Sequence, residues 1–374
     1  MDSSHLLLRP STDVFVIGGG PAGLAAAIAA RQRGFDVTVS DAAVPPIAKA
    51  CGEGIMPDGV SAARSLGIHL ESLPSRPFSG IRFCEAGRSI AARFPQGAGL
   101  GVRRTDLHRL LADRAAAAGV RLLWGTRAEA VAPRGVSVGG DFVRARWIVG
   151  ADGVNSAVRR SAGLDPRHRL QRRFGFGRHY RVEPWTEYME LHWAPHCQLF
   201  VTPVADDEVC VVVISNSASL RLDDALLAFP EVTQRLQNAQ ATSERGGVTG
   251  SRSLGSVARG NVVLVGDASG SVDAITGEGI CLSFQHALAL ADALEAGKLA
   301  HYSAAHRRLR RRPELMSRFM LLMGRRDRLR NRILKAMAAE PALFTRMLAL
   351  HVGELSVPEA CRNALSLGWQ MVLS

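Results

Sequence analysis

The stretch that most constrains the fold is Val14–Asp41, which reads VFVIGGGPAGLAAAIAARQRGFDVTVSD. Val14–Ile17 is a short apolar run rich in β-branched residues, a pattern typical of a strand buried on both faces. A glycine-rich turn follows it, and Leu24–Arg33 continues as an Ala-rich helix. Val37–Val39 predicts a second strand that leads to Asp41. Strand, turn, helix and strand therefore succeed one another as in a βαβ unit.

The glycines of this turn fit the pattern G-x-G-x-x-G, which is typical of dinucleotide-binding turns. Gly18 permits the tight turn, Gly20 lets a pyrophosphate approach the backbone, and Gly23 allows the helix to pack closely on the strand. The pyrophosphate would lie on the free N–H groups at the helix N-terminus, where the helix dipole favours negative charge. Asp41 would accept hydrogen bonds from the ribose hydroxyls. We therefore expect the chain to bind a dinucleotide.

The composition is that of a folded intracellular protein. The chain has 374 residues, 47% of them hydrophobic, so it can bury a large core and form two subdomains. Its start, MDSSHLLLRPS, lacks the features of a signal peptide, and no apolar run is long enough to cross a bilayer. The six cysteines are scattered without a C-x-x-C pair. We expect reduced thiols in the cytoplasm, with no disulfide framework and no metal site.

The net charge of +12 is concentrated in one segment. Residues 301–335 contain twelve Lys and Arg residues against two acidic ones, a net charge of +10. The rest of the chain is therefore close to neutral. No basic sheet with interleaved aromatic residues accompanies the charge, so we expect no nucleic-acid partner.

The remaining elements can be placed from periodicity and turn signals. Long alternating segments without intervening helices predict an antiparallel sheet over Arg173–Asn216, which we assign to the substrate-facing subdomain. The other expected strands are Ile81–Glu85, Ser89–Phe94, Val120–Trp124, Arg127–Val131, Val136–Val138, Phe142–Val149 and Asn261–Val265. The expected helices are Asp58–Leu66, Arg104–Gly119 and a helical region after Gly297 with breaks near Pro313, Pro341 and Pro358.

Three separated segments give the chain a family resemblance. They read GGGPAG at 18–23, GADGVNSAVR at 150–159 and GDASGSVDAITGEGI at 266–280. In this order and spacing they resemble the single-Rossmann FAD enzymes with the p-hydroxybenzoate hydroxylase fold, which include aromatic and polyketide monooxygenases and geranylgeranyl reductases. Three such motifs are far more specific than any one of them.

The resemblance implies an α/β fold. It consists of an FAD-binding Rossmann-like domain of the glutathione-reductase type, an inserted antiparallel β-sheet substrate domain and a helical C-terminus. We assign residues 1–72, 95–165 and 250–300 to the FAD-binding domain, 73–94 and 166–249 to the substrate domain, and 301–374 to a basic helical segment.

The resemblance also implies which residues bind FAD. Asp267 would bind a ribityl hydroxyl, Asp152 would help to fix the FAD and reduced-nicotinamide region with support from Arg159, and Arg104 would reach the phosphate and ribityl region. Backbone N–H groups near the start of a helix at Glu278–Leu294 would face the flavin pyrimidine, where reduced flavin carries negative charge. The full predicted set is Gly18, Gly20, Pro21, Ala22, Gly23, Asp41, Cys51, Arg104, Asp152, Asp267, Gly277, Gly279 and Ile280.

Three functions fit these motifs. The first is an NADPH- or NADH-driven FAD monooxygenase that hydroxylates a lipophilic aromatic or polyketide-type molecule through a flavin hydroperoxide. The second is an FAD-dependent reductase of isoprenoid double bonds, since Thr276–Ile280 and Ala50–Gly54 are closer to the prenyl reductases, with Cys51 near the substrate. The favoured interpretation of Cys51 itself is a small buried packing residue. The third is a flavin-binding protein without turnover.

The basic tail has two interpretations. Its apolar residues are interleaved with arginines, so it could be a packed helical layer whose exposed face is basic. Alternatively, residues 301–335 associate weakly and reversibly with an anionic membrane surface, which would place a cytoplasmic enzyme at the membrane periphery. Pro313 and Gly324 predict two shorter helices in place of one long helix.

Overall fold

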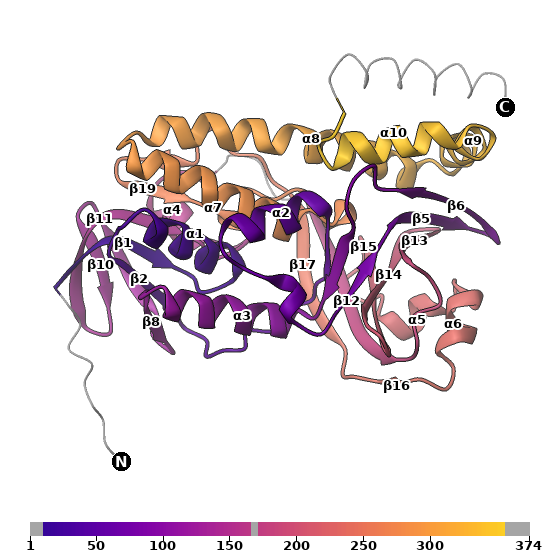
Figure 1. Cartoon of the computed structure of the whole chain (residues 1–374), viewed down its shortest axis with the longest axis horizontal. Helices are drawn as coiled ribbons and strands as arrows, with labels where there is room; N and C mark the ends of the chain where they lie inside the picture. The colour runs from indigo at the N-terminus through magenta and orange to yellow at the C-terminus, as the bar shows by residue number, and fades with distance from the viewer. Residues whose placement is uncertain (1–9, 166–170, 356–374) are drawn as a thin grey trace.

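Two large β-sheets lie toward opposite ends of the molecule, and long helices run beside both of them (Figure 1). The computed structural model describes residues 10–165 and 171–355. Helix α8 (Leu299–Arg325) forms the upper edge in this view with α9 (Asp327–Ala339) and α10 (Pro341–His351), and α7 (Gly279–Glu295) lies just beneath α8. The expected α/β fold with an antiparallel sheet and a helical C-terminal region is therefore confirmed.

The first sheet contains the predicted βαβ unit. Its strand order is β18-β19-β11-β1-β2-β8, with β10 paired to β11 and β9 paired to β10. β1 is central and parallel to both β2 and β11, and all four residues of Val14–Ile17 are buried on it. Helix α1 (Pro21–Gln32) packs on β1 and β2, and α3 (Arg104–Ala117) and α7 pack against α1. The strands are β1 (Ser11–Ile17), β2 (Val37–Asp41), β8 (Arg121–Trp124), β9 (Ala128–Ala132), β10 (Gly135–Val138), β11 (Asp141–Gly150), β18 (Ala258–Arg259) and β19 (Val262–Leu264).

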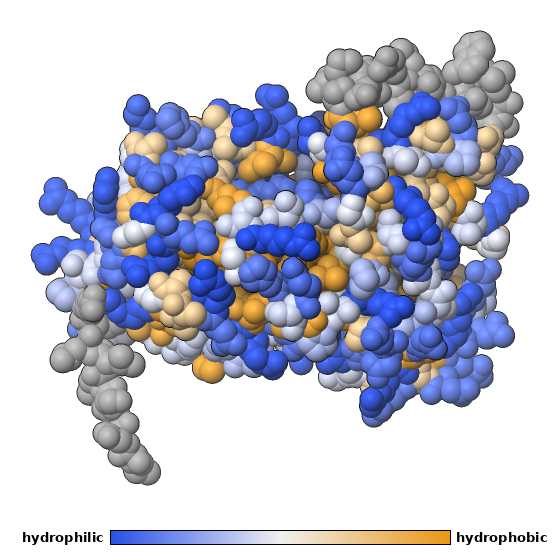
Figure 2. Space-filling model, viewed as in Figure 1, coloured by the Kyte–Doolittle hydropathy of each residue, from blue (hydrophilic) through white to orange (hydrophobic). Residues whose placement is uncertain are grey.

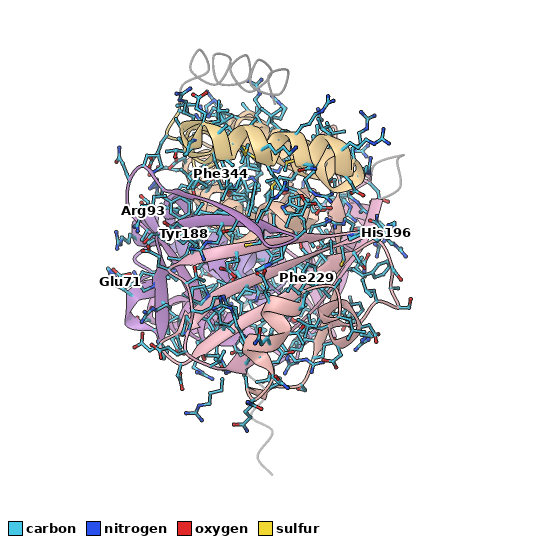
Figure 3. The ribbon with its side chains drawn as sticks, turned by 90° about the vertical axis from the view of Figure 1, so that its right-hand side faces the viewer. Glu71, Arg93, Tyr188, His196, Phe229 and Phe344 are labelled. Atoms are coloured by element: carbon cyan, nitrogen blue, oxygen red, sulfur yellow. The ribbon has the colours of Figure 1, made fainter. Side chains whose placement is uncertain are left out.

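The second sheet is the predicted antiparallel sheet. Its order is β16-β12-β15-β14-β13-β5-β6, with β17 paired to β12, and only the β13–β5 pair is parallel. Phe344 of α10 lies on one side of this sheet and Phe229, just before α6, on the other (Figure 3). The strands are β5 (Gly80–Glu85), β6 (Arg88–Arg93), β12 (Gln171–Arg181), β13 (Tyr188–Ala194), β14 (Cys197–Ala205), β15 (Glu208–Ser215), β16 (Gln240–Ala241) and β17 (Arg245–Ser251). The domain boundaries assigned from the sequence stay a prediction.

A third, small sheet was not predicted. It joins β3 (Gly54–Ile55), β7 (Gly99–Val102) and β4 (Ser75–Phe78), and its strands are too short and too rich in glycine to give a strand pattern. A Cβ atom added at Gly101 would lie 1.8 Å from the carbonyl oxygen of Pro203, so only glycine allows the backbones to approach so closely. This contact holds the small sheet against the antiparallel sheet.

The remaining helices are short. They are α2 (Pro57–Ser65), α4 (Ala157–Ser161), α5 (Leu222–Leu226), α6 (Pro230–Leu236), and the 3₁₀ turns η1 (Leu70–Ser72), η2 (Gly266–Ser269) and η3 (Ala274–Thr276). The predicted helices over Asp58–Leu66 and Arg104–Gly119 agree with α2 and α3.

The predicted break near Pro313 is wrong. α8 runs for 27 residues through Pro313 and ends only after Gly324, at Arg325. Proline costs an interior helix about 3 kcal/mol. Pro313 lies, however, on a buried stripe at helical spacing that includes Tyr302, His306, Arg310, Met316, Met320 and Met323. Packing of this stripe offsets the cost. The break at Pro341 is confirmed, and Pro358 lies outside the described residues.

Two arginines of the basic segment belong to the interior. Arg310 is 5% exposed and donates hydrogen bonds to the carbonyl oxygens of Gly270 and Arg252. Arg330 is 3% exposed, pairs with Glu85 and donates to the carbonyl oxygen of Met323. The other ten basic residues of 301–335 are exposed. Two charged side chains of this segment therefore attach the helical layer to the rest of the molecule, and the other ten lie on its surface.

Among the described residues, no helix has the length and apolar character that a bilayer span requires. The face of the molecule in Figure 2 is mostly hydrophilic, with apolar side chains gathered in small patches.

Buried histidines connect α8 and α10 to the rest of the molecule. The rings of His286 and His306 stack with centroids 4.5 Å apart, and Nε2 of His306 lies 2.9 Å from the hydroxyl of Ser269. Burial, with help from the charges of Arg310 and Arg307, lowers the pKa of His306 to about 3. The pKa of a histidine in an unfolded chain is about 6.5, so below that pH the unfolded chain binds more protons than the folded one. Stability should therefore fall as the pH drops from about 6.5 toward 3.

Replacing His306 by Phe should reduce this acid sensitivity. The wild type should lose on the order of 2 kcal/mol more unfolding free energy than His306→Phe between pH 7 and pH 4.5, because only the wild type must keep this imidazole neutral. Urea unfolding curves at the two pH values measure the difference. Equal losses in both proteins would show that His306 does not carry the effect.

Candidate functional site

A cavity of about 720 Å³ opens where the parallel strands β1, β2 and β11 end. Its walls are the carboxyl ends of these strands, the loop 42–54, the start of α7 and the facing side of the antiparallel sheet. Crevices at this edge of an α/β sheet are where cofactors bind. The cavity is thus positioned by both large sheets.

The structure brings the predicted cofactor residues together. Every residue of that set lines this cavity except Gly23, which packs behind it. The lining members are Gly18, Gly20, Pro21, Ala22, Asp41, Cys51, Arg104, Asp152, Asp267, Gly277, Gly279 and Ile280. Their individual contacts with a cofactor stay predictions.

Two of the glycines are required by close backbone contacts. Gly18 has φ +110°, and a Cβ atom there would lie 2.5 Å from the carbonyl oxygen of Ala151. A Cβ atom at Gly23 would lie 1.8 Å from the carbonyl oxygen of Gly18. Side chains at either position would push α1 away from β1 and close the approach to the helix N-terminus.

Two helix N-termini face the cavity without a side-chain cap. Neither Gly20 before α1 nor Glu278 before α7 caps its helix with a side chain. A Cβ atom at Gly20 or at Gly279 would meet no atom within 4 Å, so the backbone there borders open space. Free N–H groups and the positive ends of two helix dipoles therefore point at one cavity, an arrangement that favours anionic groups.

Arg104 adds a cationic side chain to the same cavity. Its Nε is buried and has no hydrogen-bond partner within the described chain. A buried guanidinium N–H needs an acceptor, and a phosphate or ribityl oxygen would provide one. Uncapped helix ends, this arginine and a facing apolar wall together fit FAD. When bound, FAD supplies two-electron redox chemistry.

His108, which the sequence analysis missed, fixes the glycine-rich turn. Ile47 N–H donates to Nδ1 of His108, so the proton lies on Nε2, which donates to the carbonyl oxygen of Gly19 at 2.8 Å. Burial lowers the pKa of His108, which keeps the ring neutral. On the other side, the carboxylate of Asp41 accepts from Gly19 N–H at 2.7 Å and from Ala43 N–H at 2.8 Å. A histidine inside a helix gave no sequence signal for this role.

The two predicted aspartates differ in their partners. Asp152 accepts hydrogen bonds from the hydroxyl of Ser156, the N-cap residue of α4, and from Ala157 N–H and Val158 N–H, so it supports the N-terminus of this helix. Asp267 is 39% exposed and pairs only with Lys49, at 3.2 Å, among the described residues. Asp267 is therefore the more available of the two for a cofactor hydroxyl.

Cys51 lines the cavity as a protonated thiol. Its Sγ accepts a hydrogen bond from Glu53 N–H at 3.4 Å, and burial raises its pKa. A thiol held in this state packs and donates weakly, and it is a poor nucleophile.

The loop before α7 is held from two sides. Arg173 of β12 pairs with Asp273 at 2.8 Å, and both side chains are buried. Nε2 of His351, on α10, lies 3.2 Å from the carbonyl oxygen of Thr276 and 3.0 Å from a carboxyl oxygen of Glu278. Burial lowers the pKa of His351 to about 4 and raises that of Glu278 well above its usual range, so both groups are uncharged. The C-terminal layer therefore helps to form the site.

This chain belongs to a known family of flavoproteins. A family model described as an FAD-binding domain matches residues 11–307. The chain is accordingly an FAD-dependent oxidoreductase of the p-hydroxybenzoate hydroxylase type, as the three sequence motifs predicted.

Two relatives match this chain over most of their length. Menaquinone reductase of Mycobacterium tuberculosis is 30% identical over 328 residues, covering 78% of each chain. Digeranylgeranylglycerophospholipid reductase 1 of Methanopyrus kandleri is 29% identical over 298 residues, covering 72% of this chain and 76% of that one. Among solved structures, a flavoprotein/dehydrogenase from Cytophaga hutchinsonii superposes with a TM-score of 0.82 at 17% identity, covering 96% and 98% of the two chains.

The contrast between the two aspartates gives a prediction. Asp267→Ala should weaken FAD binding about five- to a hundredfold with little change in melting temperature, because it removes one partially exposed hydrogen-bond acceptor. Asp152→Ala should mainly lower stability, by about 1 kcal/mol, because it removes the acceptor of two N–H groups in the first turn of α4.

Titration of the apo-proteins with FAD, followed by flavin fluorescence, gives the two dissociation constants, and thermal melts give the stabilities. Equal dissociation constants in two folded variants would contradict this assignment.

Proposed function

We propose that this chain is a reductase that saturates isoprenoid double bonds of a lipid-soluble compound, using FAD with NADPH or NADH as electron donor. The sequence motifs alone favour hydroxylation, with this reaction as the alternative. The apolar wall of the cavity and the names of the relatives support the reverse order.

The proposal rests mainly on the apolar side chains that form the cavity wall opposite the dinucleotide turn. Met189, Phe200, Val212 and Ile214 of the antiparallel sheet, with Ile280 of α7, line it and are each less than a tenth exposed. The other end is polar, with Asp41, Arg127, Glu129 and Asn155. A cavity divided in this way suits a polar dinucleotide at one end and a hydrocarbon substrate at the other.

A second, smaller void continues the apolar wall. It has about 20 Å³, shares Met189 and Phe200 with the cavity, and is bounded by Met316 and Met320 of α8 and Met347 of α10. Methionine side chains are flexible and fill irregular spaces, so they can move aside for a ligand. This void offers a route for a long chain between the sheet and the C-terminal helices.

The relatives support the same substrate class. Menaquinones and digeranylgeranylglycerophospholipids both carry unsaturated isoprenoid chains, and both relatives are named as reductases. Cys51 and Glu53, in the segment that resembled the prenyl reductases, line the cavity.

In this mechanism the residues of the chain orient the cofactor and the substrate and exclude water from the cavity. The uncapped ends of α1 and α7 would hold the pyrophosphate and the flavin pyrimidine, and Arg104 would hold a phosphate or ribityl oxygen. The apolar wall excludes water and positions the double bond. The nicotinamide donor would enter the same cavity, because we found a single glycine-rich dinucleotide turn in the sequence.

Anaerobic mixing tests the proposal. The holoenzyme, reduced with NADPH or NADH, should convert geranylgeraniol or a short-chain menaquinone to a product heavier by two hydrogen atoms per saturated bond, as read by mass spectrometry. The competing monooxygenase would instead require O₂ and incorporate oxygen from isotopically labelled O₂. A flavin-binding protein without turnover would give neither product.

For the basic segment we infer weak, reversible binding to an anionic membrane surface. Leu315 and Leu322 are 57% and 38% exposed and lie seven residues apart on α8. At helical spacing they share a face with Arg308, Arg311, Arg318 and Arg325, all exposed. Exposed apolar side chains flanked by cations suit the headgroup region of a bilayer, where a lipid substrate would be found.

Neutralising three of these arginines should weaken vesicle binding. Arg308, Arg311 and Arg318 changed together to Gln should lose about 1 kcal/mol each toward anionic vesicles at low salt, and the loss should fade at high salt. The matched control neutralises the exposed Arg134, Arg144 and Arg146 of the first sheet. Sedimentation with anionic and neutral vesicles measures partitioning. Equal partitioning of all three proteins would leave the packed helical layer as the sole role of this segment.

A further inference from the structure

We propose that Glu53 and His179 form a proton path that carries protons from bulk water to the substrate end of the flavin cavity. This inference rests on the proposed function in one respect, because saturating a double bond consumes one proton in a cavity walled by apolar side chains. Neither residue received a role in the sequence analysis.

Glu53 occupies an unusual backbone conformation at the cavity wall. It has φ +60°, in the left-handed region that favours glycine, and it lies between Gly52 and Gly54. The residue lines the cavity, and its side chain is only 4% exposed. A carboxyl group kept in a strained position where glycine would fit indicates a chemical function.

The two carboxylate oxygens of Glu53 have different partners. Oε1 accepts from the backbone N–H of Arg104 at 2.8 Å, at the N-terminus of α3, where the helix dipole favours a carboxylate. Oε2 lies 2.6 Å from Nε2 of His179. Oε1 is therefore held by the backbone, whereas Oε2 can exchange a proton with His179.

His179 links this carboxyl group to solvent. It lies on β12, and its side chain is 21% exposed. Its backbone N–H donates to the hydroxyl of Thr242, and its carbonyl accepts from Thr242 N–H, so its position on the strand is fixed. An imidazole exchanges protons readily near neutral pH. It can thus load from water on one side and pass a proton to Glu53 on the other.

The charges around the pair are balanced. Arg104 and Arg103 lie at the start of α3, and Arg103 is paired with Glu208. The thiols of Cys51 and Cys210 are the other titratable groups close by, and burial raises the pKa of both, which keeps them neutral. Glu53, His179 and Cys210 could together hold a metal ion by distance alone. The 2.6 Å contact, however, already uses the lone pair that a metal would require.

The proton balance of the reaction is simple. Reduced FAD, when bound, would supply the hydride for one C–H bond and would itself be oxidised. A proton from Oε2 of Glu53 forms the C–H bond on the other alkene carbon, and Glu53 is left as a carboxylate. Nε2 of His179 returns a proton to Oε2, and water reloads His179.

The chain provides a matched control pair. Glu190 is also 4% exposed and also lies 3.0 Å from a histidine, His192, on the same sheet. Neither residue lines the cavity. Glu190→Gln therefore removes an equally buried glutamate–histidine contact without touching the proposed path.

Infrared difference spectroscopy of the FAD-loaded protein tests the path without any substrate. Reduction of the flavin adds negative charge to the cavity, so Glu53 should take up a proton, and a protonated carboxyl C=O band should appear that shifts in D₂O. The band should be absent in Glu53→Gln and retained in Glu190→Gln. Absence of the band in the wild type, or its survival in Glu53→Gln, would overturn the proposal.

Turnover provides the second measurement. Glu53→Gln should slow anaerobic reduction of a geranylgeranyl substrate about a hundredfold, while reduction of the flavin by the nicotinamide donor and the FAD dissociation constant stay unchanged. His179→Gln, at the solvent edge, should show the same loss and be rescued by added imidazole.

The two hypotheses fail in different ways. A wild type that gives the carboxyl band but reduces no isoprenoid substrate contradicts the proposed function and supports the path. A wild type that reduces the substrate no faster than Glu53→Gln overturns the path alone.

Discussion

The close contact between α1 and β1 is the constraint on which the rest of the site depends. Gly23 lies so near the carbonyl oxygen of Gly18 that no side chain fits between them. This contact brings the free N–H groups of α1 to the edge of the first sheet, where β1, β2 and β11 all end. The cavity, its polar end and the position of the second sheet around it follow from that edge.

The part of the site that is local in sequence could be predicted from the sequence. The glycine turn, Asp41, Asp152 and Asp267 each lie within a short motif whose residue types have a direct physical reason. The antiparallel sheet was predictable as well, because alternation of apolar residues is a local property of each strand. The residues that make up each of these patterns lie within about thirty positions of one another along the chain.

Contacts between distant segments could not be predicted in this way. Glu53 and His179 are 126 positions apart, and His108 meets Gly19 across 89. Neither histidine departs from its local pattern, so nothing marks it before the fold is known. The prediction of a helix break at Pro313 was wrong for a related reason. Helix propensity is a local quantity, whereas the buried stripe that overrides it depends on packing.

The contact of His351 with the loop before α7 has a consequence for how the protein is made. Among the described elements β1 leaves the ribosome first, yet His351, which lies against Thr276 and Glu278, is synthesised more than three hundred residues later. The wall of the cavity therefore cannot be complete until nearly all of the described chain has emerged. We therefore expect the cofactor to bind late in biogenesis, once the C-terminal helices have packed against the sheets.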